Sequence, residues 1–493
     1  MPKKETIRVR FAPSPTGFLH IGGLRTTLFN YLFAKKNKGV FILRIEDTDQ
    51  NRLVPQAAEK LIQALDSVGL SADEGVYLDK NGQLAQNGSL GPYIQSQRLD
   101  LYQAAAQELI KKEAAYYCFC SSERLEKLRE QQQANKQVPK YDGNCRKLDP
   151  KTVAEKLANS EKYVIRFKVA ENIIVNAQDL IYGEIKVKSE DLDDFVLLKS
   201  DGFATYHLAN VVDDHAMQIS HVIRGEEWLP SLPKHILLYQ AFNYEAPIFV
   251  HLPLLLNPDK SKLSKRQGDV AVEDYLTKGY LPAALINYIA LLGWNPGTEQ
   301  EIFSLNELIK NFSLEKINKS GAVFDLKKLQ WLNNHYIKKY LADKKSYPEI
   351  LKLTKQFIPE HEAQIPDLLK IFGSRLNYLA EIKDLSTFIF SLPDYDGSLL
   401  IFKKSDNDKT KQGLKAALEI LTNLKDNNWQ ENKLFSALED LVKAQNLTPG
   451  DVFWPIRVCL SGLEKSPSPA EILAILGKKE SIRRIELGLA KIK

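Results

Sequence analysis

The stretch Phe11-Ala-Pro-Ser-Pro-Thr-Gly-Phe-Leu-His-Ile-Gly-Gly23 decides the fold predicted for this chain. The segment Ile7–Phe11 predicts a short strand, the proline and glycine residues predict a stiff loop, and His20 begins a helix. The first turn of a helix presents unpaired N–H groups, and Gly22 and Gly23 let a ligand approach the backbone closely. We therefore expect a phosphate site here, with His20 as a hydrogen-bond donor.

A second segment, Lys262-Leu-Ser-Lys-Arg266, follows the turn Asn257-Pro-Asp259 and supplies mobile cations. Each segment alone has an ordinary explanation. A histidine beside glycines is more often a helix cap or a packing residue, and a lysine-rich loop is usually solvated. Because the two occur in this order in one chain, they predict a site for the phosphates of ATP. The groups that we expect to act in catalysis are His20, Lys262 and Lys265.

These two segments resemble the paired signatures of class I aminoacyl-tRNA synthetases, and the surrounding sequence is similar to that of the glutamyl-tRNA synthetases. The likeness is dense over roughly the first two thirds of the chain and thin after about Leu341. Gly23 stands where the first signature has its second histidine, and Leu263 replaces the usual methionine of the second, but neither change removes a phosphate-facing group. The stretches that carry the resemblance are Ala12–Gly17, Arg44–Asp49, Thr205–His215 and Arg224–Trp228.

The resemblance implies a glutamate site with fixed cations for two carboxylates and an anion for the ammonium group. Arginine suits this task because its planar guanidinium binds a carboxylate through two hydrogen bonds. An arginine at a strand end is more often part of a structural ion pair, so that alternative stays open. The residues implied for glutamate are Arg10, Ala12, Ser14, Glu46, Tyr206, Asn210 and Arg224. Those implied for ATP are His20, Gly22, Gly23, Glu227, Leu255, Lys262, Ser264, Lys265 and Arg266.

The activity that the resemblance implies is that of a glutamate–tRNA ligase in protein biosynthesis. ATP and L-glutamate form glutamyl-adenylate, with Mg²⁺ bridging the phosphates, and the glutamyl group then passes to the 3′ end of tRNA-Glu. Whether tRNA-Gln is also charged stays open. Such chemistry needs positioning and neutralisation of charge on phosphate oxygens rather than a catalytic triad. The chain has no Walker loop, dinucleotide-binding glycine motif or His-Glu-x-x-His, which removes the commonest other interpretations of an α/β enzyme.

The cysteines resemble the zinc knuckle of many bacterial glutamyl-tRNA synthetases. Cys118 and Cys120 are followed, after 24 intervening residues, by Cys145. The fourth ligand of that knuckle is usually a histidine two places further on, where this chain has Lys147, and a protonated lysine is a poor zinc ligand. Tyr141 is a substitute, because a similar Tyr-x-x-x-Cys spacing occurs in the related glutamyl-queuosine enzymes. A structural zinc site and a metal-free group of thiols both stay open.

At 493 residues the chain is too long for a single core, so several domains are expected. The predicted fold class is α/β: a split Rossmann-like nucleotide-binding catalytic domain with an α+β insertion, followed by an all-α anticodon-binding region. Arg375 in that region is the candidate for reading the anticodon, although a solvated helix face is the common fate of such a residue. The predicted segments are 1–80 and 203–257 (catalytic), 81–202 (insertion, acceptor-end binding), 258–340 (stem contact) and 341–493 (anticodon binding).

The bulk properties fit an ordinary soluble enzyme. A net charge of +5 permits binding to tRNA without arguing for it. Four cysteines do not make a disulfide framework, and no apolar run suits a signal core or a membrane span. We therefore expect a cytoplasmic protein with no membrane partner, and the resemblance implies a monomer.

Four other functions are weighed against the ligase. A glutamyl-queuosine enzyme would lack the long helical region after the lysine segment, and a glutaminyl enzyme would be expected to show Glu-Pro-Asn-Gly in place of Ser14-Pro-Thr-Gly17. An inactive paralogue that only binds tRNA would be expected to lose His20 or Lys265, and both are present. A nucleotidylyltransferase would not need Arg10, Glu46 and Arg224 together.

Overall fold

The computed structural model describes residues 6–263 and 270–492. The chain divides into two compact units: Met1–Thr277 with Pro282–Leu329, and Lys278–Leu281 with Gln330–Lys493. We call them the catalytic unit and the helical unit. Within the described ranges, no helix is both long enough and apolar enough to cross a membrane.

The first sheet of the catalytic unit places the nucleotide loop at the end of a buried strand. The strands lie in the order β1-β2-β3-β4, with the first three parallel and β4 antiparallel. All four residues of β1 are buried, as expected for a parallel strand that is covered on both faces. The elements are β1 (Arg8–Phe11), α1 (Ile21–Lys36), β2 (Val40–Leu43), α2 (Ala57–Ser67), β3 (Glu74–Leu78) and β4 (Leu84–Asn87).

The second sheet forms the opposite wall of the unit, in the order β10-β11-β7-β8. The N–H of Ser220 donates to the carbonyl of Arg8 at 2.9 Å, so β10 lies beside β1, and the last residues of both strands, Phe11 and Gly225, line one cleft. The carboxyl ends of both strands therefore meet at one edge, which is where α/β sheets bind ligands. The elements are β7 (Ile174–Asp179), β8 (Gly183–Lys188), α6 (Tyr206–Ala216), β10 (His221–Gly225), α7 (Leu232–Phe242) and β11 (Ile248–Leu252).

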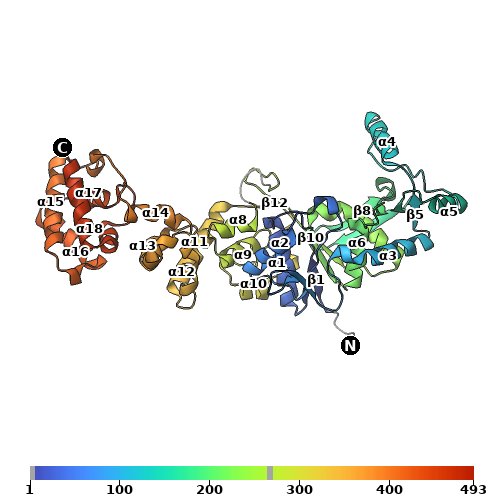
Figure 1. Cartoon of the computed structure of the whole chain (residues 1–493), viewed down its shortest axis with the longest axis horizontal. Helices are drawn as coiled ribbons and strands as arrows, with labels where there is room; N and C mark the ends of the chain where they lie inside the picture. The colour runs from blue at the N-terminus through green and yellow to red at the C-terminus, as the bar shows by residue number, and fades with distance from the viewer. Residues whose placement is uncertain (1–5, 264–269, 493) are drawn as a thin grey trace. The chain divides into compact units, whose positions relative to one another are not determined.

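A third sheet, β5-β6-β9, is antiparallel and belongs to the segment between the two walls. In Figure 1 helix α4 extends away from the sheets of its unit. Residues 81–202 are predicted as a separate insertion. Part of this segment belongs to the second wall, because β7 pairs with β11 and β8 pairs with β7. The elements are α3 (Leu99–Lys111), β5 (Ala115–Cys118), α4 (Ser122–Ala134), α5 (Pro150–Ala158), β6 (Val164–Phe167) and β9 (Val196–Leu198).

The rest of the catalytic unit surrounds a small parallel pair, β12 with β13, next to the lysine segment. Its elements are β12 (Leu255–Leu256), α8 (Val272–Thr277), α9 (Pro282–Ala290), α10 (Leu305–Asn311) and β13 (Ala322–Val323), and the boundary between the units falls within α11 (Leu326–Ala342).

Beyond α11, the described residues form only helices, and α15 to α18 pack side by side (Figure 1). The buried side chain of Arg484 joins α18 to α14 and α17, because it donates to the carbonyls of Phe388 at 2.7 Å and Leu460 at 2.6 Å. The predicted α/β domain with a helical C-terminal region is confirmed. The helices are α12 (Tyr347–Lys355), α13 (Ile365–Phe372), α14 (Glu381–Phe390), α15 (Asn407–Asn423), α16 (Glu431–Ala444), α17 (Pro449–Ser461) and α18 (Pro469–Lys491).

The packing of β3 against β2 makes a stability prediction. Gly75 has φ +115°, and a Cβ atom there would lie 2.1 Å from the carbonyl oxygen of Leu43. Gly69 also has a positive φ, +77°, but a Cβ atom there would meet nothing within 4 Å. We expect Gly75→Ala to lower the free energy of unfolding of the catalytic unit by ~4 kcal/mol, and Gly69→Ala by only ~1 kcal/mol. Calorimetric unfolding measures both, and equal losses would contradict the steric explanation.

Candidate active site

The nucleotide loop has the predicted strand–loop–helix form. His20 caps the N-terminus of α1, where its Nδ1 accepts a hydrogen bond from the N–H of Gly22 at 2.9 Å. Because Nδ1 is the acceptor in the neutral ring, the proton lies on Nε2. One cleft is lined by His20, Gly22 and Gly23. A ligand in this cleft can therefore contact both the start of α1 and the imidazole of His20.

The described residues on either side of 264–269 are held by backbone hydrogen bonds. The N–H of Leu263 donates to the carbonyl of Leu255 at 2.9 Å, and the N–H of Ile21 donates to that of Val270 at 2.8 Å. At Val270 the chain therefore lies at the first turn of α1. The side chain of Lys262 is exposed. The predicted contacts of Ser264, Lys265 and Arg266 fall outside the described residues.

A cleft of about 910 Å³ opens where the two sheets meet. Asn210, Leu255 and Lys262, which were also predicted to bind substrates, do not line it. Asn210 is buried, and its Nδ2 has no hydrogen-bond partner within the part of the chain that the structure describes. The cleft brings together the predicted residues Arg10, Ala12, Ser14, His20, Gly22, Gly23, Glu46, Tyr206, Arg224 and Glu227.

Arg10 belongs to a buried ion network on one wall of the cleft. Its Nε and Nη2 donate to the two oxygens of Asp214 at 3.0 and 3.2 Å. Arg44 donates to the same carboxylate at 2.7 Å and to Glu46 at 2.9 Å. Burial raises the pKa of Glu46, although Arg44 and Arg10 act against this rise. The structural ion-pair alternative for Arg10 is therefore correct, and the same side chain also reaches the cleft.

Arg224 occupies the other wall in a different electrostatic setting. Its Nε donates to Nε2 of His251 at 3.0 Å and its Nη1 to the hydroxyl of Tyr206 at 2.9 Å. Its Nη2 lies 3.2 Å from Nδ1 of His235. Among the described residues, no carboxylate forms an ion pair with this buried guanidinium. The charge of Arg224 is thus available to a ligand in the cleft.

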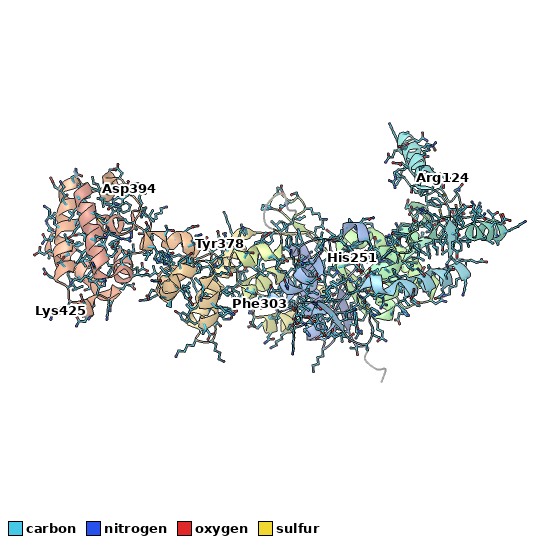
Figure 2. All side chains as sticks on the ribbon, in the orientation of Figure 1. Arg124, His251, Phe303, Tyr378, Asp394 and Lys425 are labelled. Carbon is cyan, nitrogen blue, oxygen red and sulfur yellow. The ribbon has the colours of Figure 1, made fainter. Side chains whose placement is uncertain are left out.

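The histidines around Arg224 are neutral. Burial lowers the pKa of His235 well below its usual value, and the nearby positive charge of Arg224 lowers it further. Burial also lowers the pKa of His251, although Asp179 acts in the opposite direction. For His207, whose Nδ1 lies 3.2 Å from Nε2 of His235, burial lowers the pKa to about 4. Figure 2 labels His251 within the body of the catalytic unit.

The three cysteines of the insertion meet at one point. Their sulfur atoms all lie within 4.8 Å of one another, and Cys120 and Cys145 are 3.6 Å apart. The hydroxyl oxygen of Tyr141 lies 3.3 Å from the sulfur of Cys118 and 3.6 Å from that of Cys120. A tetrahedral zinc ion with three sulfurs and one oxygen separates its ligand atoms by about 3.5–3.8 Å. These four side chains therefore match the size of such a site, and Lys147 is exposed.

Comparisons with known proteins agree with this geometry. Residues 6–331 match the family model described as tRNA synthetases class I (E and Q), catalytic domain, and residues 349–489 match an anticodon binding domain. A glutamate–tRNA ligase from Alkaliphilus metalliredigens is 46% identical over 491 residues, which cover 98% of each chain. The chain belongs to the glutamate–tRNA ligase family of class I tRNA synthetases.

Further members of the family agree in sequence and in fold. The glutamate–tRNA ligase of Clostridium novyi is 46% identical over 499 residues, which cover 100% of this chain and 99% of the relative. A crystal structure of a glutamate–tRNA ligase from Elizabethkingia meningosepticum in complex with its amino acid superposes with a TM-score of 0.88. The two sequences are 36% identical, and the match covers 99% of this chain and 100% of that one.

Several site residues of this synthetase were missed by sequence reasoning. Asp213 and Asp214 lie on α6 seven and eight positions after Tyr206, and Asn210 lies four positions after it. That spacing places all four on one face of a helix, which is a signal that the sequence contained. Asp179, His235 and His251 come from three other elements and gave no local signal.

Arg375 is half-exposed in the helical unit. Its Nη1 donates to the carbonyl of Ile371, and its Nη2 lies 3.4 Å from the carboxylate of Glu471 at the start of α18. This contact is long, so little reorganisation is needed before the guanidinium meets another partner. The predicted role of Arg375 in reading the anticodon stays a prediction.

The network on Asp214 makes a prediction about stability. Burial opposes ionisation of Asp214, but Arg10 and Arg44 outweigh it, and the pKa lies below its usual value. Asp214→Asn leaves buried cations with too little negative charge, so the free energy of unfolding should fall by ~3 kcal/mol at neutral pH. This difference should shrink as the pH falls through the pKa that Asp214 has in the folded protein, because the wild-type carboxylate then loses its charge as well.

The control is Glu161→Gln, which breaks an exposed pair with Lys156 and should leave the unfolding midpoint within error of wild type. Denaturant unfolding at several pH values measures both variants. A loss for Asp214→Asn that persists unchanged at low pH would contradict the electrostatic explanation.

Proposed function

We propose that this ligase binds L-glutamate between the Arg10 and Arg224 walls of the cleft and joins it to ATP held at the start of α1. The observation that carries the proposal is the unpaired guanidinium of Arg224 in a cleft that also contains Glu46 and the His20 loop. A dicarboxylate with one ammonium group needs that combination of one uncompensated cation, a second arginine and an anion.

Within this pocket Arg224 binds the side-chain carboxylate of glutamate, and the hydroxyl of Tyr206 lies beside it. Glu46 accepts the ammonium group, and Arg10, Ala12 and Ser14 complete the wall next to the substrate. Tyr206 is held by Trp228, whose ring centroid lies 4.0 Å from its own. Asn210 donates its unpartnered Nδ2 toward this pocket through a small rearrangement or a water molecule.

ATP lies along the nucleotide loop with its phosphates at His20, Gly22 and Gly23. Glu227 holds the ribose, and the backbone near Leu255 contacts the adenine. We assign Lys262, Ser264, Lys265 and Arg266 to the phosphates. In support, Val270, the first described residue after them, accepts a hydrogen bond from Ile21 at the start of α1. Mg²⁺ would neutralise negative charge on the phosphates. The α-carboxylate of glutamate attacks the α-phosphorus, and pyrophosphate leaves. The terminal hydroxyl of tRNA-Glu then attacks the carbonyl carbon of glutamyl-adenylate, takes the glutamyl group and releases AMP.

For tRNA, we assign residues 81–202 to the acceptor end, 258–340 to the stem and 341–493 to the anticodon, with Arg375 as an anticodon contact. The catalytic domain comprises 1–80 and 203–257. The expected cytoplasmic location and monomeric state stay predictions.

The test of the proposed function is charging of purified tRNA-Glu and tRNA-Gln with labelled glutamate, with glutamine and aspartate as controls, at fixed ATP and Mg²⁺. Glutamate on tRNA-Glu alone would define an enzyme that discriminates between the two tRNAs. Glutamate on both would mean that another enzyme must amidate the product on tRNA-Gln. Absence of charging on either tRNA would contradict the proposal.

The second signature gives a kinetic prediction. We expect Lys265→Ala to slow formation of glutamyl-adenylate by ~10²-fold or more in a single turnover, because the ammonium group stabilises charge in the transition state. Lys260→Ala, in the turn just before the segment, should change the rate by less than about threefold and controls for the loss of a lysine. An unchanged single-turnover rate for Lys265→Ala would remove that residue from catalysis.

The cysteine cluster gives a metal prediction. We propose that Cys118, Cys120, Cys145 and Tyr141 hold one structural Zn²⁺, which would steady the insertion. The wild-type protein should then contain about one zinc per chain. Tyr141→Phe keeps the ring on which Arg166 stacks at 3.9 Å but removes the oxygen, so a chromogenic chelator should extract zinc ~10-fold faster or more. Tyr163→Phe in the same insertion is the matched control. A wild-type protein without zinc would contradict the site, and equal release rates would exclude Tyr141 as a ligand.

A further inference from the structure

Every hydrogen-bond acceptor that the described residues offer to the buried guanidinium of Arg224 is neutral. Of its five N–H donors, the described residues engage three, through His251, Tyr206 and His235. Nη1 and Nη2 each keep one further N–H, and a carboxylate binds such a pair of donors. The ring of Phe249 lies 5.6 Å from the guanidinium carbon and covers one face of the group.

The hydrogen bonds also fix which ring nitrogen carries each proton. His251 accepts from Arg224 at Nε2, so its proton lies on Nδ1, which donates to the carboxylate of Asp179 at 2.8 Å. His235 accepts from Arg224 at Nδ1, so its proton lies on Nε2 and points to Nδ1 of His207 at 3.2 Å. The low pKa values of all three histidines agree with these neutral forms.

This arrangement separates a carboxylate from the arginine by the width of one imidazole ring. Asp179 is fully buried and accepts the backbone N–H groups of Ile181 and Tyr182, both at 2.9 Å, besides the bond from His251. The negative charge of Asp179 therefore acts on Arg224 only across the imidazole ring of His251. Arg10 shows the opposite design, since Asp214 contacts its guanidinium directly through two hydrogen bonds. One arginine of the cleft is neutralised in place and the other is not.

We propose that His235 and His251 are positioning residues that set amino-acid specificity, by holding Arg224 in place without neutralising it. The proposal rests on the proposed function, in which Arg224 receives the side-chain carboxylate of the substrate. The side-chain carboxylate of glutamate interacts with the full positive charge of Arg224 and accepts hydrogen bonds from both of its remaining N–H groups. The amide of glutamine carries no charge, and its NH₂ group would face donors rather than acceptors, so the pocket rejects it.

The matched test compares His235→Asn with His235→Asp. Both side chains place an oxygen near the position of Nδ1 and accept the Nη2 hydrogen bond, and they differ in charge. We expect the Asp variant to have a glutamate KM ~10-fold or more above that of the Asn variant, with equal KM values for ATP, because its carboxylate competes with the substrate for the arginine. The ratio of kcat/KM for glutamate over glutamine should also be ~10-fold or more lower in the Asp variant.

A second pair, His251→Gln and His251→Glu, repeats the comparison at the hydrogen bond that Nε of Arg224 donates. This pair keeps the proposal falsifiable if one variant at position 235 does not fold. Charging of tRNA-Glu with labelled glutamate and glutamine supplies the kinetic constants, and thermal unfolding shows which variants are folded. The expected result is the same order at both positions, with the acidic variant the poorer binder of glutamate.

Equal effects of the neutral and acidic substitutions, on glutamate KM and on the glutamate-to-glutamine ratio, would overturn the proposal and leave the histidines a purely structural role. Failure of the proposed function is a distinct outcome, since in that case the wild-type protein itself does not charge tRNA-Glu. Wild-type activity together with equal variants therefore rejects only the role of the histidines.

Discussion

The carboxylate of Asp214 holds the catalytic unit together at its site. Asp214 lies on α6, in the second half of the split domain. Its carboxylate accepts hydrogen bonds from Arg10 on β1 and from Arg44, the residue that follows β2. Four charged groups, with Glu46, are buried in this network, and such burial is tolerated only when each charge meets an opposite charge in good geometry. This ion network thus joins the two walls of the cleft.

That network explains why the cleft can leave Arg224 unpaired. The charges of Arg10 and Arg44 are compensated locally, whereas no carboxylate among the described residues forms an ion pair with Arg224 at the opposite wall. Neutral histidines provide the hydrogen bonds that a buried guanidinium requires, while Asp179 stabilises the group from a distance. Arg10 and Arg224 therefore line one cleft although they are far apart in the sequence, and their immediate partners distinguish them.

At the cysteine cluster, a tyrosine of the same loop lies close to the sulfur atoms. Lys147 is exposed, whereas the hydroxyl of Tyr141 points at two of the three sulfurs and accepts the backbone N–H of Cys145 at 2.9 Å. The oxygen is thereby fixed in place before any metal binds. The surrounding insertion has few large apolar groups at this point beyond Tyr116, Leu125, Leu148 and Val164, so a metal ion would add a cross-link where the core is small.

The sequence by itself determined the fold class, the family and most of the cleft. The strand–loop–helix start, the lysine segment and the motifs near Arg44, Tyr206 and Arg224 are local patterns, and local patterns report on backbone conformation and on residues that face a substrate. Only the tertiary structure decided the partners of the arginines. Asp179 lies 45 positions before Arg224, and His251 lies 27 after it, on different strands. Whether a buried arginine is neutralised or left charged depends on which side chains the folded sheets bring within 3 Å of it, and no spacing along the chain encodes that distance.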